Sequence, residues 1–219
     1  MLFHDRYEAG RFLAAKLKHF ANRPDVVVLA LPRGGAPVGY EVAKALNVPL
    51  DVFIVRKLGV PGHKELAMGA IASGSVRVLN QEVIDALGIP ETVIDEVAAR
   101  EERELEHQER TYRDGRPPLD VQGRTVILVD DGLATGSSMR VAAAALRNKQ
   151  PAQIAVAVPV ASPDTCAEFV AEVDEVVCAA TPEPFWAVGA WYGDFSQTSD
   201  EEVRNLLLRA ASFPAPKAA

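Results

Sequence analysis

The sequence predicts an α/β fold, in which a mainly parallel, twisted sheet carries helices on both faces. Three observations lead to this class. Residues 25–31 form an aliphatic, largely β-branched run, as is typical of a strand buried on both faces of a parallel sheet. Segments with the apolar spacing of helices alternate with such strands along the chain. The aliphatic run 126–129 ends in Asp130 and Asp131, at the strand end where parallel sheets bind ligands.

The first quarter of the chain predicts a helix followed by a βαβ unit. Residues 5–20 carry apolar side chains at helical spacing, after Asp5 as the N-cap. Strand 25–31 is followed by a helix over 36–47 and a second buried strand over 50–55. The crossover between two such parallel strands should be right-handed.

The middle of the sequence is less regular. Residues 58–75 are rich in glycine and carry charges at their centre, so we expect a mobile loop that runs into a short hairpin ending near residue 80. Residues 91–113 predict a heavily charged helix, which we expect to be solvated and supported by i,i+4 ion pairs. Residues 113–124 form a turn-rich connector.

Regular alternation resumes after this connector. Ser162 and Pro163 suit the N-cap and the first position of a helix, and Ser199 with Glu202 has the spacing of a capping box. We expect strands over 125–129, 153–160 and 175–180, and helices over 137–148, 163–172 and 199–211.

Composition predicts one soluble globular domain of 219 residues. The formal net charge of −7 argues against a broad nucleic-acid surface. The longest apolar runs have the length of strands, so we expect no membrane span. Cys166 and Cys178 lack metal-ligand spacing, and no secretory signal is recognised, so we expect packing residues in a reducing cytoplasm.

The segment VILVDDGLATGSSM (126–139) joins an acidic pair to a turn of small and hydroxylated residues. Adjacent carboxylates each raise the cost of ionising the other, so they indicate a ligand that compensates them. Residues 134–138 can direct backbone N–H groups toward a phosphate ahead of a helix, although no lysine makes them a Walker loop. A ribose 5-phosphate satisfies both halves, because its hydroxyls donate to carboxylates. The phosphate-binding candidates are Ala134, Thr135, Gly136, Ser137 and Ser138.

This segment resembles the phosphoribosyl-pyrophosphate (PRPP) binding motif of type I phosphoribosyltransferases, in which four hydrophobic residues precede two acids and a Thr-Gly loop. The segment LPRGGAPVG (31–39) resembles the family's pyrophosphate loop. There Arg33 supplies charge, and Gly34 and Gly35 let N–H groups approach an anion.

Residues 55–71 resemble the family's mobile catalytic loop. The resemblance places Arg56 and Lys57 at a strand end, where both would bind pyrophosphate. Lys64 and Glu65 at the centre of the segment are explained equally well as solvated loop charges or as catalytic groups.

The segment PEPFWAVGAWYGDF (182–195) resembles the hood of purine-salvaging members, in which an aromatic residue stacks on the base. By this resemblance the base is contacted by Trp186, Val188 and Asp194. The match is partial, because the family's acidic residue lies four positions after the glycine that corresponds to Gly189, whereas Asp194 lies five positions after it. The aromatic residues are explained equally well as hydrophobic cover for the sheet edge. Across nearly the whole chain, the pattern resembles bacterial predicted phosphoribosyltransferases of unassigned substrate.

The resemblance implies transfer of the 5-phosphoribosyl group from PRPP to a nitrogenous base, purine-like because of the hood, with release of pyrophosphate. Asp130 and Asp131 would hold the ribose hydroxyls, directly or through Mg²⁺, and residues 134–138 would bind the 5′-phosphate. Arg33 and Lys57 would complete the catalytic set, while Mg²⁺ neutralises the leaving group.

The resemblance also implies the organisation of the chain. We expect a single phosphoribosyltransferase domain with a core over 24–80 and 122–181, a charged helical insertion over 81–121, and a hood over 182–198 with contributions from the terminal helices. Ala134 stands where hypoxanthine-type members carry an acid, so this loop offers no general base.

Two other functions stay open. The first is a PRPP-responsive regulator, which would keep the phosphate sites without turnover. The second is a nucleotide-binding structural module, for which the resemblance of the arginine-containing segments around residues 33 and 56 to the family's loops would be a coincidence. PRPP and a base are the expected partners, with no nucleic acid and no membrane. A homodimer is an open alternative for the assembly.

Overall fold

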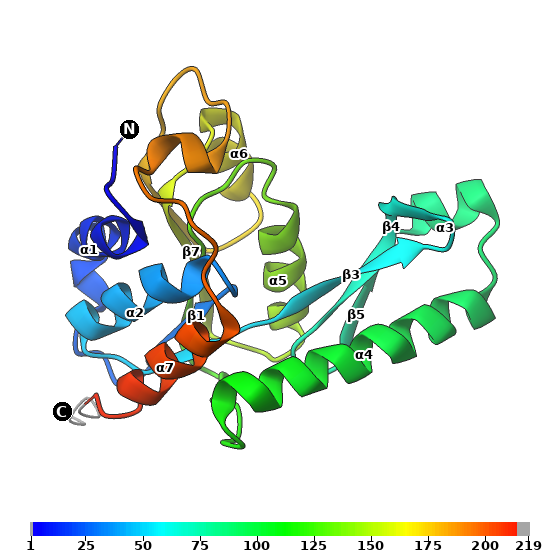
Figure 1. Cartoon of the computed structure of the whole chain (residues 1–219), viewed down its shortest axis with the longest axis horizontal. Coiled ribbons are helices and arrows are strands. Elements are labelled where there is room, and N and C mark those ends of the chain that lie inside the picture. The colour runs from blue at the N-terminus through cyan, green and yellow to red at the C-terminus, as the bar shows by residue number, and fades with distance from the viewer. Residues whose placement is uncertain (1, 214–219) are drawn as a thin grey trace.

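The computed structural model describes residues 2–213, without the side chains of residues 64 and 65, and has a five-stranded sheet at its centre (Figure 1). The strand order is β2-β1-β6-β7-β8, and every neighbouring pair is parallel. The predicted α/β class with a parallel sheet is therefore confirmed. The strands are β1 (Val26–Ala30), β2 (Leu50–Val52), β6 (Thr125–Val129), β7 (Gln153–Val160) and β8 (Glu175–Ala180).

Helices cover both faces of this sheet, because the strand side chains alternate between two apolar clusters. In β1, Val26, Val28 and Ala30 belong to one cluster, and Val27 and Leu29 belong to the other. The first cluster includes side chains of α1 (Arg6–Lys16), α2 (Gly35–Leu46) and α7 (Asp200–Ala210), and the second includes those of α5 (Ser137–Arg147) and α6 (Pro163–Phe169).

Capping residues set three helix starts where the sequence predicts them. Asp5, Ser162 and Ser199 each accept a hydrogen bond from the backbone N–H three residues later, before α1, α6 and α7. The helix ends are less well predicted. α1 stops at Lys16 and a short 3₁₀ turn follows it, while α6 stops at Phe169, three residues before the predicted end.

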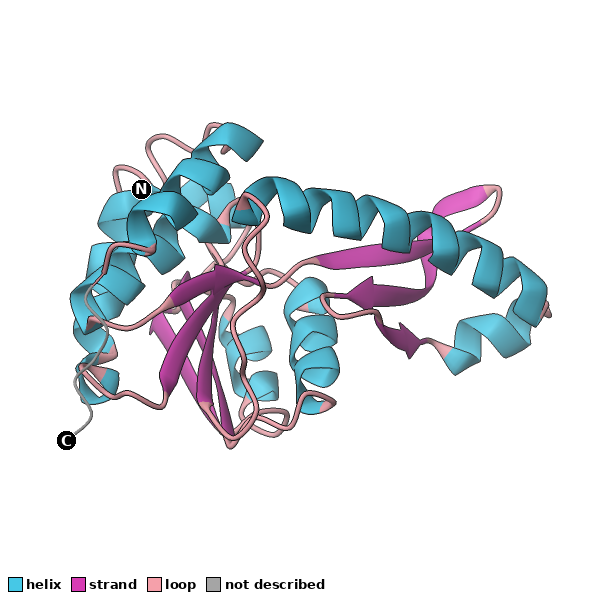
Figure 2. Ribbon diagram, turned by 90° about the horizontal axis from the view of Figure 1, so that it is seen from below, coloured by secondary structure: helices cyan, strands magenta, loops and turns pink. Residues whose placement is uncertain are grey.

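The chain between β2 and β6 leaves the central sheet and forms an arm (residues 55–113) that projects from the core in both views (Figures 1 and 2). The arm contains a three-stranded antiparallel sheet in the order β3-β4-β5, with α4 packed along it. Its elements are β3 (Val55–Val60), β4 (His63–Ala72), β5 (Val76–Leu79), α3 (Gln81–Leu87) and α4 (Glu91–Arg113).

The prediction of a loop over 58–75 is wrong, because regular strands occupy most of this range. β3 pairs with β4 along its length, with an irregular register at Gly59. A Cβ on Gly69 would lie 2.5 Å from the carbonyl oxygen of Val78 on the next strand. The glycines that suggested a loop therefore mark a bulge and a close approach between strands.

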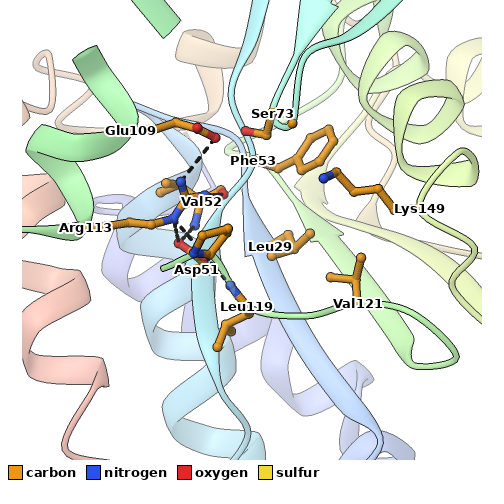
Figure 3. Close-up of a pocket in the computed structure, with 12 residues that line it drawn as sticks. Leu29, Asp51, Val52, Phe53, Ser73, Glu109, Arg113, Leu119, Val121 and Lys149 are labelled. Atoms are coloured by element: carbon orange, nitrogen blue, oxygen red, sulfur yellow. Dashed lines mark hydrogen bonds and ion pairs between the residues drawn. The ribbon is translucent and has the colours of Figure 1, made fainter. Parts of the chain in front are cut away.

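The C-terminal end of α4 is anchored to β2 by a buried ion pair (Figure 3). Arg113 Nε donates to Asp51 Oδ1 at 2.9 Å, and its Nη2 donates to the carbonyl oxygen of Val52 at 3.0 Å. Glu109 Oε1 lies 3.2 Å from Arg113 Nη1. The helix is therefore solvated on its outer face only, and its last turn fixes the arm to the sheet.

Cys166 and Cys178 form a disulfide, which the sequence did not predict. They lie in α6 and β8, and both still pack against the apolar cluster beneath α5, as expected of packing residues. The cysteine argument for a reducing compartment is thereby lost, and the cytoplasm stays a prediction. From residue 2 to residue 213, no helix is both long enough and apolar enough to cross a membrane.

Candidate functional site

An acidic pair lies at the carboxyl end of β6, beside the end of β1. All five residues of β6 are buried, and Asp130 and Asp131 follow the last of them. Both acids are partly buried, and the Asp131 side chain is 15% exposed. This is the edge at which open parallel sheets bind their ligands.

The loop before α2 passes directly against this acidic pair. A Cβ on Gly34 would lie 2.1 Å from Asp131 Oδ2, and a Cβ on Gly35 would lie 2.7 Å from the carbonyl oxygen of Val129. The Leu31 N–H donates to that same carbonyl oxygen at 2.8 Å, which fixes the approach of the loop. A side chain at Gly34 would displace the Asp131 carboxylate, and one at Gly35 would meet the backbone of β6, so the structure brings together the two glycines and the two acids that the sequence singled out.

The two carboxylates differ in how their charge is compensated. Burial raises the pKa of Asp130 well above its ordinary value, and the negative charge of Asp131 raises this pKa further. Burial also raises the pKa of Asp131, but Arg6 opposes this, since its Nε donates to Asp131 Oδ2 at 2.8 Å. Among the side chains that the structure describes, Asp130 forms no ion pair of its own.

The loop that follows the acids has backbone N–H groups available to an anion. The carbonyl oxygens of Ala134 and Thr135 accept from Thr165 Oγ1 and Arg140 Nη1, both at 2.6 Å. Within the described part of the chain, the N–H groups of residues 134–136 and 138 donate to no acceptor. Residues 134, 135, 137 and 138 are exposed ahead of α5. This loop has the features of a phosphate site at a helix N-terminus.

Gly136 lets this loop turn, with φ at 70°, a backbone conformation that favours glycine. A Cβ there would lie 2.5 Å from Phe169 Cε2, so a side chain would also displace α6.

The Arg33 side chain points to the first residue of α7 and not to the acidic pair. Its Nη1 lies 3.7 Å from Asp200 Oδ1. Asp200 in turn accepts a 2.5 Å hydrogen bond from the Tyr112 hydroxyl, and burial raises the pKa of Tyr112 to about 12. The side chain of Arg33 therefore lies beside the glycine loop with one exposed carboxylate as its partner.

The structure does not bring Arg56 and Lys57 into contact with the acidic pair. Arg56 binds Glu101 of α4 through Nε at 2.9 Å and Nη2 at 2.8 Å. Lys57 is exposed and lines an open cavity of about 450 Å³ with Gly59, Arg100 and Glu101. Both residues belong to the arm.

The hood is held over the acids by the N-terminal segment. The Phe3 N–H donates to the carbonyl oxygen of Trp191 at 2.9 Å, and the Gly193 N–H donates to the carbonyl oxygen of Phe3 at 2.8 Å. The Tyr192 hydroxyl donates to the carbonyl oxygen of Asp131 at 2.5 Å. Sequence reasoning missed this pairing, because contacts between chain ends leave no local pattern.

Some aromatic residues of the hood cover the sheet edge, whereas another is free to contact a base. Phe185, Trp191 and Tyr192 pack in a small apolar cluster with Phe3, as cover for the sheet edge. Trp186 is 81% exposed, and nothing in the fold requires its ring.

The other two base-contact candidates occupy different settings. Val188 packs on Gly132, where a Cβ would lie 2.5 Å from Val188 Cγ1. Asp194 is exposed and accepts from the Ser196 N–H at 2.9 Å. Val188 thus lies beside the acidic pair, while Asp194 is occupied in a local turn.

Arg6 is the residue at this site that sequence reasoning missed. It stands at the first position of α1, where a single arginine gives no functional signal. Beyond Asp131, its Nη1 donates to the carbonyl oxygen of Ser196 at 2.7 Å, and its guanidinium lies 4.0 Å from the Phe195 ring centroid.

The acidic pair fits a magnesium ion that arrives with a phosphate-bearing ligand. Mg²⁺ commonly binds through one or two carboxylates, with waters and substrate phosphates as the remaining ligands. Asp130 offers a carboxylate without a direct cationic partner. With the side chains of residues 64 and 65 left aside, residues 2–213 contain no group of three or more His, Cys, Asp or Glu side chains that could hold a metal alone.

The cavity in Figure 3 is separate from this site. It measures about 90 Å³ and lies where the arm joins the sheet, around Asp51, Arg113 and Lys149. None of the site residues predicted from the sequence lines it. Its charged groups are mainly those that anchor α4.

Comparisons with known proteins identify the family of the chain. A family model described as phosphoribosyl transferase domain matches residues 61–190, which is more than half of the chain. The Mycobacterium tuberculosis (strain H37Rv) protein named "Putative phosphoribosyl transferase Rv0571c" is 46% identical over 209 residues, covering 95% of this chain and 47% of that protein. The chain thus spans about half the length of this curated relative.

Solved structures share the fold. The protein TT1426 from Thermus thermophilus is 42% identical with a TM-score of 0.82, covering 95% of this chain and 99% of that one. A hypothetical protein from Neisseria gonorrhoeae with bound ppGpp has a TM-score of 0.52 at 14% identity, covering 95% and 96% of the two chains, and shows a common fold alone. With the family model covering most of the core and the acidic motif inside the match, the chain belongs to the phosphoribosyl transferase domain family.

Proposed function

We propose that the chain is a PRPP-dependent phosphoribosyltransferase, which transfers the 5-phosphoribosyl group to a nitrogenous base and releases pyrophosphate. The observation that carries this proposal is the convergence of three groups at one sheet edge. They are the acidic pair, the available N–H groups of residues 134–136 and 138, and the glycines 34 and 35. Carboxylates accept from hydroxyls, and N–H groups donate to phosphates. Together they suit a ribose that carries phosphate groups on both sides.

Each group has a distinct role in this proposal. Asp130 and Asp131 accept hydrogen bonds from the ribose hydroxyls, residues 134–138 bind the 5′-phosphate, and Arg33 with the adjacent glycine N–H groups binds pyrophosphate. The carboxylates also stabilise the positive charge that develops on the ribose as the bond to pyrophosphate breaks. Mg²⁺, when bound, neutralises charge on the leaving pyrophosphate.

The base site is assigned to the hood. Trp186 presents an exposed ring able to stack on a planar base, and Val188 adds an apolar contact beside Gly132. A large exposed aromatic ring favours a purine-like base, as in nucleotide salvage. Arg56 and Lys57 join the pyrophosphate site only if the arm approaches the acids, because Arg56 is bound to Glu101.

A transfer assay tests this function. Pyrophosphate release and product mass would be measured with PRPP, Mg²⁺ and a panel of purine and pyrimidine bases. We expect a 5′-mononucleotide from at least one purine-like base and loss of turnover in Asp130→Asn. Asp174→Asn is the matched control, since Asp174 pairs with Arg147 and lies outside the site.

The outcomes separate the alternatives. Tight PRPP binding with no product from any base would favour a PRPP-responsive regulator. Absence of PRPP binding would reject both functions.

A further inference from the structure

Arg6 connects three parts of the molecule that are distant in sequence. Its side chain is 11% exposed and extends from the first turn of α1. One edge of the guanidinium binds Asp131, its Nη1 binds the carbonyl oxygen of Ser196, and one face lies on the Phe195 ring. A single side chain thus contacts the acidic pair and the end of the hood.

These contacts require the shape of a guanidinium as well as its charge. The group is planar, presents donors in a fixed fork, and stacks on aromatic rings, whereas an ammonium is a compact charge on a flexible stem. A lysine at this position could compensate Asp131. It could not bind Asp131 and Ser196 while covering Phe195.

Arg6 also determines which oxygen of Asp131 is available. Its Nε occupies Oδ2, and no hydrogen bond among the described side chains and backbone groups uses Oδ1. Backbone bonds fix the same region, because the Asp194 N–H donates to the carbonyl oxygen of His4 at 2.7 Å. Backbone hydrogen bonds of residues 3 and 4 therefore hold the hood in place, and the Arg6 side chain links the hood to Asp131.

We propose that Arg6 is a positioning residue that directs Oδ1 of Asp131 toward the ribose and holds residues 194–198 over the same site, so that the ribose and base sites are assembled together. The inference rests on the proposed function insofar as Asp131 binds ribose. The link between Arg6 and the hood does not depend on it.

Three variants test this role: Arg6→Met, Arg6→Lys, and Arg11→Met as the matched control on the same helix. Arg11 is exposed, and its Nη1 lies 3.9 Å from Glu41 Oε1. Hydrogen exchange of peptides covering residues 187–198 would be measured without ligand. We expect exchange about tenfold faster in both Arg6 variants, as for loss of one charged hydrogen bond, and unchanged exchange in the control.

Kinetics then measure the consequence for the site. We expect the KM values for PRPP and for the base to rise together, each by about tenfold, in Arg6→Lys, although the positive charge is retained. A role in charge compensation alone would leave Arg6→Lys like the parent in both KM and hood exchange. That result would overturn the proposal.

Other outcomes are equally decisive. Faster exchange that spreads evenly over α1 and α2 would mean that Arg6 merely supports the fold. If Arg6→Met does not fold, the exchange of Arg6→Lys decides the question. Failure of the parent to bind PRPP would reject the proposed function, while the hood exchange would still report on the Arg6 link.

Discussion

Two arginine–aspartate pairs in the described part of the chain, the buried Arg113–Asp51 pair and the partly buried Arg6–Asp131 pair, differ in what surrounds the carboxylate. Asp51 accepts from Arg113 on both oxygens and also from the backbone N–H groups of Val52 and Leu119. Asp131 gives Oδ2 to Arg6, while no hydrogen bond in the described chain uses Oδ1. A second acid, Asp130, lies beside it, and the charge of Asp131 helps to raise the pKa of Asp130.

This difference distinguishes a carboxylate with a structural role from one that can bind a ligand. A carboxylate whose acceptor positions are all filled by the protein has little left to offer a hydroxyl or a metal ion. Asp51 meets that description and holds the arm to the sheet through Arg113. Asp131 retains an acceptor at the edge of the sheet where ligands bind. Burial and an arginine partner alone would not have distinguished the two.

The largest effect is expected from Arg113→Met. This change leaves Asp51 buried without its cation, which should cost about 3–5 kcal/mol of unfolding free energy. Chemical denaturation would measure the loss, with Arg110→Met on the exposed side of the same helix as the control. A loss below about 1 kcal/mol, which is the range of exposed ion pairs, would mean that the Arg113–Asp51 pair does not anchor the arm.

The matching change at the other pair is Asp131→Asn. Asparagine can still accept from Arg6 and removes repulsion with Asp130, so the unliganded protein should unfold as the parent does. PRPP with Mg²⁺ at one hundred times its dissociation constant stabilises the parent by about 2.7 kcal/mol. Loss of a charged acceptor should weaken binding by roughly 1.5–3 kcal/mol and remove most of this gain.

Thermal unfolding with and without PRPP measures this effect, and Asp174→Asn should respond like the parent. Turnover should fall more than affinity, because positive charge grows beside the carboxylate in the transition state. A variant with the ligand-induced shift and turnover of the parent would place the ribose elsewhere.

Trp186→Ala extends the comparison to a residue with a mostly exposed side chain. Its ring is 81% exposed, so unliganded stability should change by no more than about 0.5 kcal/mol. If the ring stacks on the base, base affinity should fall by roughly 1–3 kcal/mol while PRPP affinity stays constant. Calorimetric titrations with each ligand measure the two affinities, and an equal loss of both would assign Trp186 to the fold.

A pH-dependent effect on stability is expected from Asp130→Asn in the absence of metal and PRPP. The pKa of Asp130 is raised in the folded protein, so its contribution to stability is full below its ordinary pKa of 3.8 and is lost as the pH rises through the raised value. The variant should therefore gain stability over the parent near neutral pH and gain little below 3.8. Denaturation at both pH values tests this, and an equal gain at both would exclude an ionised, uncompensated Asp130.

Sequence patterns predicted the features of this fold that depend on neighbouring residues. The strands of the central sheet carry continuous apolar runs, and Asp5, Ser162 and Ser199 cap their own helices, so each could be located from a short window. The hairpin β3–β4 was misjudged because glycine marks both loops and strand irregularities, and only the pairing of Gly69 with its neighbouring strand distinguishes them.

Local motifs also predicted which of the candidate site residues lie together. The acids, the loop 134–138 and the two glycines each carry a local motif, and the parallel sheet brings their strand ends together. Arg6 could not be found, since its partner Asp131 lies 125 residues away and no pattern joins them. The disulfide and the pairing of the hood with the N-terminal segment were missed for the same reason.

The arm has a consequence for how the chain folds. Val26 of β1 pairs with Thr125 of β6, roughly 100 residues later, because the whole arm is inserted between them. Contacts within the arm join residues close in sequence, and these close small loops at little entropic cost, whereas the β1–β6 pairing must close a loop that contains the whole arm. The glycines of residues 34 and 35 meet the acids only when that pairing forms. We therefore expect the phosphate-binding edge to be among the last parts of the molecule to assemble, so that a chain with a complete arm and an unformed β1–β6 pair would have no site.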